Sequence, residues 1–128
     1  MNHKTKLIRY LFYFSLFFLF LIYLLPGELI KFQKNNELNA LKEFYGSIYH
    51  FFYFFFLTIV GLMSYINKNF FIKTFIFLLI LSILIEFLHL YVPNREFSLF
   101  DILANVSGFV LGFFIITLTK KYIKKWYE

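Results

Sequence analysis

The sequence predicts an all-α integral membrane protein, a four-helix bundle formed by a single domain over residues 1–128. Three observations predict it. Hydrophobic residues make up 61% of the chain, including 22 Phe, whereas charged residues make up only 16%. A soluble domain of this size buries only about two-thirds of the surface that its unfolded chain exposes, so it could not hide this much apolar surface. The apolar residues also form four blocks, with basic residues at their ends.

Each of the four blocks has the length of a membrane span. They run from about residue 10 to 25, 48 to 66, 74 to 92 and 102 to 118. At 1.5 Å per residue these blocks are roughly 24–29 Å long, close to the ~30 Å hydrocarbon core of a bilayer. Pro26-Gly27 closes the first block. Because no small-x-small cleavage pattern stands there, we interpret this block as a retained helix and not as a signal peptide.

The basic residues predict the orientation of the chain. One side of the predicted bundle, which holds both termini, carries most of them: Lys4, Lys6, Arg9, Lys68, Lys73, Lys120, Lys121, Lys124 and Lys125. The other side carries Lys31, Lys34, Lys42 and Arg95, diluted by Glu28, Glu37, Glu43, Glu96 and Asp101. The positive-inside rule therefore predicts cytoplasmic termini, with the loops 26–47 and 93–101 facing outward.

The net charge of +6 is explained by this topology and does not indicate a nucleic-acid partner. Its basic residues are divided among three segments at the ends of apolar spans, whereas nucleic-acid binding needs a continuous basic face. The expected partners are membrane lipids. The cluster from Lys120 to Lys125 predicts an interface anchor, with capture of an anionic lipid as the lesser alternative. Without Cys, disulfides and Cys-ligated zinc are excluded, and we expect no cofactor.

Six polar side chains gather near the predicted outer ends of the spans: His50, Glu86, His89, Arg95, Asp101 and Asn105. A charge at the centre of a span costs about 2.5–3.5 kcal/mol, so polar groups in spans need a structural or functional reason. These six come from three helices and one loop, and all fall within roughly the outer 10 Å of the membrane. The sequence therefore predicts a polar pocket below the outer surface.

Each of these residues also has a structural explanation. Arg95 could form a salt bridge to Asp101 or Glu96 that fastens the loop, or its planar fork could bind an anionic group of a ligand. Glu86 could be protonated or hydrogen-bonded and join two helices. His50 and His89 could be interface histidines whose hydrogen bonds are satisfied.

Two further patterns concern metal binding and helix packing. Glu86-x-x-His89 matches half of a di-metal carboxylate motif, but the second Glu-x-x-His is missing, so we expect no metal site. Small residues recur on one face of the fourth span and predict a helix-packing ridge: Ala104, Gly108 and Gly112.

The segment over residues 86–112 resembles the signature of the VanZ-like family. It carries that family's Glu, Pro-x-Arg, Asp, Asn and two Gly residues without a gap: Glu86, Pro93, Arg95, Asp101, Asn105, Gly108 and Gly112. His50-Phe51 is similar to the earlier His-Phe motif of the family.

Four positions depart from the family pattern. His89 replaces the usual Gln, Asn94 replaces a Gly, and Ser98 replaces an Asp. Gly46-Ser47 replaces an Asp-Lys pair. Asn at position 94 is a mild change, because Asn tolerates left-handed turn geometry nearly as Gly does.

The resemblance implies a small multi-pass protein of the bacterial cytoplasmic membrane, in a family whose namesake is linked to teicoplanin resistance. We hypothesise that the polar pocket binds a lipid or peptidoglycan-related ligand from the outer leaflet. The main alternative is a proton-coupled multidrug exporter that works as a homo-oligomer and uses Glu86 to carry the proton. An accessory membrane subunit is another alternative. The sequence lacks a nucleophile motif and a complete metal-ligand set, which favours a non-enzymatic role without deciding it.

Overall fold

The computed structural model describes residues 3–26, 39–66 and 69–127. The predicted outward residues 27–38, with Lys31 and Lys34, lie outside these ranges, as does Lys68 of the opposite loop. The described residues form four α-helices and one 3-10 turn: α1 (His3–Tyr23), α2 (Asn39–Ser64), α3 (Phe70–Leu88), η2 (His89–Tyr91) and α4 (Leu99–Tyr127).

The predicted all-α class is confirmed, since all four α-helices are long and apolar enough to cross a membrane. Two of them end before their apolar blocks do. Helix α1 ends at Tyr23, because Pro26 disfavours helical geometry at the residue before it. In the same way, α3 ends at Leu88 and a 3-10 turn leads towards Pro93. This turn places His89 on a tighter helical step than the prediction assumed.

Helices α2 and α4 are longer than their apolar blocks. Helix α2 begins at Asn39, ahead of the block that starts near residue 48, and α4 continues past residue 118 to Tyr127. The flanking segments contain Lys, Leu and Glu, which are good helix formers. Hydropathy therefore marked the part of each helix that matches the bilayer core, while helix propensity extended the helix beyond it.

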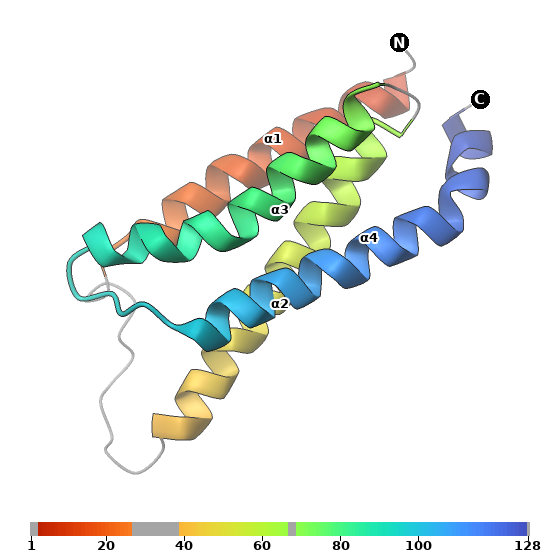
Figure 1. The fold of residues 1–128 in the computed structure, drawn as a ribbon. Coiled ribbons are helices and arrows are strands. Elements are labelled where there is room, and N and C mark those ends of the chain that lie inside the picture. The colour runs from red at the N-terminus through yellow and green to blue at the C-terminus, as the bar shows by residue number, and fades with distance from the viewer. Residues whose placement is uncertain (1–2, 27–38, 67–68, 128) are drawn as a thin grey trace.

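Helices α2 and α4 form the most extensive helix pair of the described chain, with α1 against α2 and α3 against α4 (Figure 1). Two glycines of α4 allow the close approach. A Cβ atom at Gly108 would overlap the backbone carbonyl of Phe51, and one at Gly112 would lie 3.0 Å from the Phe55 carbonyl oxygen. Both glycines belong to the predicted packing ridge, and its third member, Ala104 on the same helix, is half-buried.

The core between the helices is aromatic and aliphatic, with Phe54, Leu57, Leu78, Ile85 and Phe109 all buried. Many other large apolar side chains are exposed on the outside of the bundle. In water, an apolar surface of this kind would cause the protein to aggregate, whereas a bilayer solvates it.

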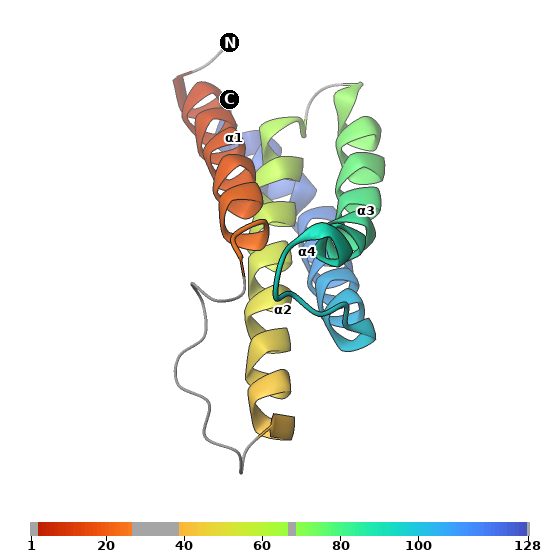
Figure 2. The same cartoon turned by 90° about the vertical axis from the view of Figure 1, so that its left-hand side faces the viewer.

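The two ends of the described chain lie at the same end of the bundle (Figures 1 and 2). There the Lys4 ammonium donates a hydrogen bond of 2.9 Å to the Trp126 carbonyl and lies 4.7 Å from the centre of the Trp126 ring. The loop between α3 and α4 lies at the opposite end (Figure 1). In this loop Asn94 has a φ of 57°, the left-handed conformation that the sequence suggested for this position.

Candidate functional site

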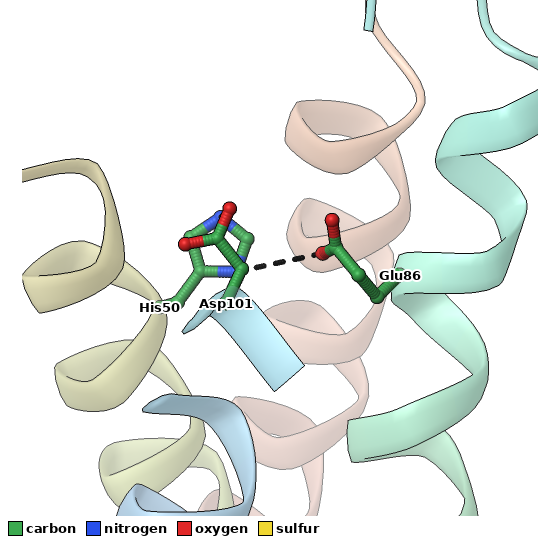
Figure 3. Close-up of side chains that lie close together, drawn as sticks. All are labelled: His50, Glu86 and Asp101. Atoms are coloured by element: carbon green, nitrogen blue, oxygen red, sulfur yellow. Dashed lines mark ion pairs between the residues drawn. The ribbon is translucent and has the colours of Figure 1, made fainter. Parts of the chain in front are cut away.

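Polar side chains from three helices meet at the end of the bundle opposite the termini. His50 of α2, Glu86 of α3 and Asp101 of α4 lie close together around one point (Figure 3). His50 Nδ1 lies 4.0 Å from Glu86 Oε2, and His50 Nε2 lies 3.9 Å from Asp101 Oδ2. The imidazole of His50 therefore stands between two carboxylates, as the predicted pocket requires.

Glu86 is fully buried, and only one of its two carboxylate oxygens has hydrogen-bond partners among the described residues. Oε1 accepts a hydrogen bond of 3.0 Å from the backbone N–H of Ser98 and lies 3.1 Å from His89 Nδ1. His89 reaches Glu86 because it follows three residues later, one helical turn along the chain. Oε2 has no hydrogen-bond partner in the described chain and faces His50.

Asp101 follows the same pattern at the rim of the cluster. The hydroxyl of Ser47 donates a hydrogen bond of 2.5 Å to Asp101 Oδ1, and Oδ2 faces His50. Asp101 lies in the first turn of α4, where the helix dipole favours a negative charge. Its own backbone N–H donates to the hydroxyl of Ser98 at 3.4 Å, which helps to satisfy the start of the helix.

Asn105 lies one turn after Asp101 on the same face of α4, as the spacing predicted. It is fully buried, and its Oδ1 lies 3.2 Å from His50 Nδ1. Because an amide oxygen only accepts hydrogen bonds, this contact requires a proton on His50 Nδ1. The lone pair of Nε2 in the neutral ring then points to the side of Asp101.

Arg95 is placed differently from the salt bridge that the sequence suggested. Its guanidinium donates to two backbone carbonyls, to Ile22 in the last turn of α1 at 3.0 Å and to Leu25 just after the helix at 3.3 Å. Among the described residues, Arg95 forms no ion pair with Asp101 or Glu96. Arg95 thus satisfies carbonyls that the helix end leaves without partners.

Burial lowers the pKa of the Arg95 guanidinium, and the nearby carboxylates of Glu86 and Asp101 act in the opposite direction. Arginine stays protonated in proteins at physiological pH. A permanent positive charge therefore stands beside the carboxylate cluster without touching it.

A groove of about 570 Å³ opens beside the cluster. Side chains of α1, α2 and the α3–α4 loop line it: Ile22, Tyr23, Gly46, Tyr49, His50, Phe52, Tyr53, Phe56 and Arg95. The ring of Tyr23 packs over the imidazole of His50 with their centres 4.7 Å apart. Most of the wall is aromatic, and the polar groups are concentrated at His50 and Arg95.

A second cavity of about 530 Å³ borders the cluster from the loop side. Gly46 lines both cavities, and Asp101 lines the second one together with Ser98 and Phe100. The His50–Asp101 pair therefore lies between two openings and is accessible from each.

Sequence reasoning missed part of this site. Ser47 was noted only as a departure from the family pattern, although it precedes His50 by three residues and so shares its helical face. Ser98 was treated likewise, yet it contacts both Glu86 and Asp101. The groove aromatics gave no signal of their own, because aromatic residues make up 26% of this chain.

The cluster also contains a set of side chains with metal-ligand chemistry. His50, Glu86 and Asp101 each offer one ligand atom, and these atoms lie within 4.8 Å of one another. The sequence pattern indicated only the pair Glu86-x-x-His89 as metal ligands, and no metal site was expected from it. In the structure His89 instead contacts Oε1 of Glu86, the oxygen that faces away from His50. His50 of α2 and Asp101 of α4 complete the set of ligands.

Comparison with known proteins identifies the family. The model of the VanZ/LLP1 family matches residues 3–120, which include α1, α2, α3, most of α4 and every residue of the cluster. No curated protein and no solved structure matches the chain. With four apolar helices and this family match, the chain is a multi-span membrane protein that belongs to the VanZ/LLP1 family.

Proposed function

We propose that this protein binds an amphipathic ligand of the bacterial cell envelope, a lipid or a lipid-linked peptidoglycan precursor, from the outer leaflet of the cytoplasmic membrane. The observation that carries this proposal is the groove of about 570 Å³, which joins an aromatic wall to the side chains of His50 and Arg95. Ligand sites are typically apolar with a few convergent polar groups. An anionic headgroup would meet the polar end, and the hydrocarbon chain would follow the wall.

The aromatic wall is open towards the surrounding bilayer. The side chains of Phe52, Phe56 and Tyr49 line the groove and are 59%, 46% and 76% exposed. A lipid could therefore enter sideways from the membrane without crossing water. This lateral access supports a membrane-dissolved ligand over a water-soluble one.

Arg95 is suited to recognise the anionic end. Its contacts to Ile22 and Leu25 use two of the five N–H donors of a guanidinium, and the same side chain lines the groove. Guanidinium groups bind phosphate and carboxylate with two parallel hydrogen bonds. The bonds to α1 would hold the fork in place and reduce the entropy lost when a ligand binds.

The placement in the outer leaflet rests on the basic residues. Lys4, Lys73 and Lys125 lie at the ends of the spans remote from the cluster, where the positive-inside rule places the cytoplasm. The polar cluster and the groove would then face the periplasmic or extracellular side. Family membership further suggests a role in teicoplanin susceptibility, which growth assays with and without the gene would test.

Binding of defined lipids to the purified protein tests the proposal. We expect detergent-solubilised protein to bind phosphatidylglycerol or a polyprenyl phosphate more tightly than zwitterionic phosphatidylethanolamine, as measured by native mass spectrometry. Arg95→Gln should weaken binding of the anionic lipids roughly 10- to 150-fold, because a charged hydrogen bond contributes about 1.5–3 kcal/mol. The control Arg9→Gln changes the other arginine, which lies at the opposite end of the bundle, and should leave binding unchanged.

A second pair of variants tests the apolar wall. Phe52→Ala removes a groove residue that is 59% exposed, and Phe14→Ala removes a residue of α1 outside the groove that is 60% exposed. We expect only Phe52→Ala to weaken lipid binding. Equal affinity for anionic and zwitterionic lipids, together with equal effects of the two Phe variants, would remove the proposal.

A further inference from the structure

We infer that His50, Glu86 and Asp101 form a binding site for one divalent transition-metal ion of the Zn²⁺ or Mn²⁺ type. These side chains come from α2, α3 and α4 and converge on one point (Figure 3). One imidazole and two carboxylates are a ligand set that such ions accept. The inference goes beyond ligand binding in the groove and does not depend on it.

The distances between the inner atoms suit an ion better than direct hydrogen bonds. His50 Nε2, the nitrogen that can bind an ion, lies 3.9 Å from Asp101 Oδ2, and the protonated Nδ1 lies 4.0 Å from Glu86 Oε2; both distances exceed the 2.7–3.2 Å of a hydrogen bond. Ligand atoms about 2.0–2.2 Å from a common tetrahedral ion lie roughly 3.3–3.6 Å from one another. The cluster, with its ligand atoms within 4.8 Å, needs to contract by about an ångström to hold an ion.

Each carboxylate is held by its outer oxygen, which leaves its inner oxygen free for an ion. Glu86 Oε1 contacts the Ser98 N–H and His89, while Oε2 faces the centre of the cluster. Asp101 Oδ1 accepts from the Ser47 hydroxyl, while Oδ2 faces His50. Outer partners of this kind orient the ligands of metal sites in proteins.

Asn105 completes the outer layer. Its amide oxygen accepts a hydrogen bond from His50 Nδ1 at 3.2 Å, and this fixes the ring with the lone pair of Nε2 free. Ligating histidines commonly donate their other N–H to a protein oxygen in this way. All three ligands are therefore oriented before an ion arrives, and the contraction only has to bring them closer together.

The charge of the cluster gives a physical reason for a cation. Glu86 is fully buried, and its Oε2 has no hydrogen-bond partner in the described chain. A second carboxylate, Asp101, lies on the other side of His50. Two carboxylates taken out of water are costly unless a cation or protons neutralise them. The described hydrogen bonds of Arg95 go to the backbone carbonyls of Ile22 and Leu25. Arg95 therefore does not neutralise the two carboxylates by direct contact.

The site has open approaches for an incoming group. His50 lines the groove of about 570 Å³ and Asp101 lines the cavity of about 530 Å³. Three protein ligands leave at least one coordination position of the ion free. That position would accept water or an anionic oxygen of a groove ligand.

Metal binding to tag-free protein tests the inference. After chelator treatment and dialysis, we expect detergent-solubilised protein to bind one Zn²⁺ or Mn²⁺ ion per chain, measured by calorimetric titration and elemental analysis. Asp101→Asn and His50→Gln should weaken the affinity at least 100-fold. Asn105→Ala should weaken it about 10- to 100-fold, the range expected for an outer-layer partner. The control His3→Gln removes a histidine at the opposite end and should change nothing.

Thermal unfolding keeps the test decisive if a variant is unstable. A bound ion should raise the Tm of the wild-type protein, because it binds the folded chain only. Absence of a Tm shift and of bound metal in the wild type would overturn the inference, as would binding that survives in both Asp101→Asn and His50→Gln. Lipid binding measured in excess chelator separates the two proposals, because it tests the groove without the ion.

Discussion

His50 Nδ1 and Asn105 Oδ1 lie 3.2 Å apart and join α2 to α4 inside the polar end of the bundle. Asn105 is fully buried and the side chain of His50 is 12% exposed, so this contact is largely shielded from water on the Asn105 side. It fixes which nitrogen of His50 carries the proton, and it thereby decides what the ring offers to Glu86 and Asp101. The arrangement of the whole cluster depends on this pair.

Loss of this contact should destabilise the bundle. We expect Asn105→Ala to lower the free energy of unfolding by about 1 kcal/mol, because hydrogen bonds between membrane helices contribute modestly and the amide also fills space. Ser107→Ala, on the exposed face of the same helix, is the matched control and should change it by less than about 0.5 kcal/mol. Thermal or denaturant unfolding in detergent measures both, and equal losses would contradict the role of Asn105.

The glycines of the bundle should show a graded response to a methyl group. Gly108→Ala would place a Cβ atom against the Phe51 carbonyl and should destabilise by about 2–3 kcal/mol through overpacking. Gly112→Ala meets the Phe55 carbonyl oxygen at 3.0 Å and should cost less. A Cβ atom at Gly46 has nothing within 4 Å, so Gly46→Ala should be neutral or slightly stabilising. Unfolding free energies that do not follow this order would contradict the packing of α2 on α4.

Glu86 distinguishes ligand binding from proton-coupled export. In the structure Glu86 is held by Ser98 and His89 at one end of the bundle, whereas the coupling sites of transporters lie near the membrane midplane. We expect purified protein to release no protons when a lipophilic cation is added, for the wild type and Glu86→Gln alike, as measured with a pH-sensitive dye. Proton release that only the wild type shows would favour the exporter.

The orientation in the membrane can be tested because the chain contains no Cys. Glu96, Lys73 and Lys125 are exposed, so each can be replaced by a single Cys in separate variants. In intact cells, a membrane-impermeant maleimide should label Glu96→Cys but label Lys73→Cys and Lys125→Cys only after lysis. The reverse pattern would place the cluster on the cytoplasmic side and contradict the outer-leaflet proposal.

The four helices were predictable from hydropathy because a helix that crosses the bilayer must be apolar over about the thickness of the hydrocarbon core. The ends of the helices were harder to predict from hydropathy. Asn39 and Tyr127 lie in polar flanks, where helix propensity and not apolarity determines how far a helix extends. Pro26 predicted that the first helix would stop by residue 25, because the effect of proline on the preceding residue is local, and α1 ends two residues earlier at Tyr23.

Most members of the polar cluster were predictable, except Ser47 and Ser98, but the hydrogen bonds among them were not. Spacing alone placed Asp101 and Asn105 on one face and Glu86 beside His89, because helical periodicity is a local property. The partner of Arg95 was not foreseen, since it is the backbone of α1 some 70 residues earlier, and backbone carbonyls carry no sequence signal. The same holds for the groove, which exists only after α1 docks on α2.

The central claim is that the groove beside His50 and Arg95 selects a particular amphiphile from the membrane. Photo-crosslinking in living cells tests it most directly, with a benzophenone amino acid at Phe52 in the groove and, in a separate variant, at Phe14 outside it. Mass spectrometry of the adducts should find an anionic or lipid-linked species enriched at position 52 and bulk lipid at position 14. Identical adducts at both positions would contradict the claim.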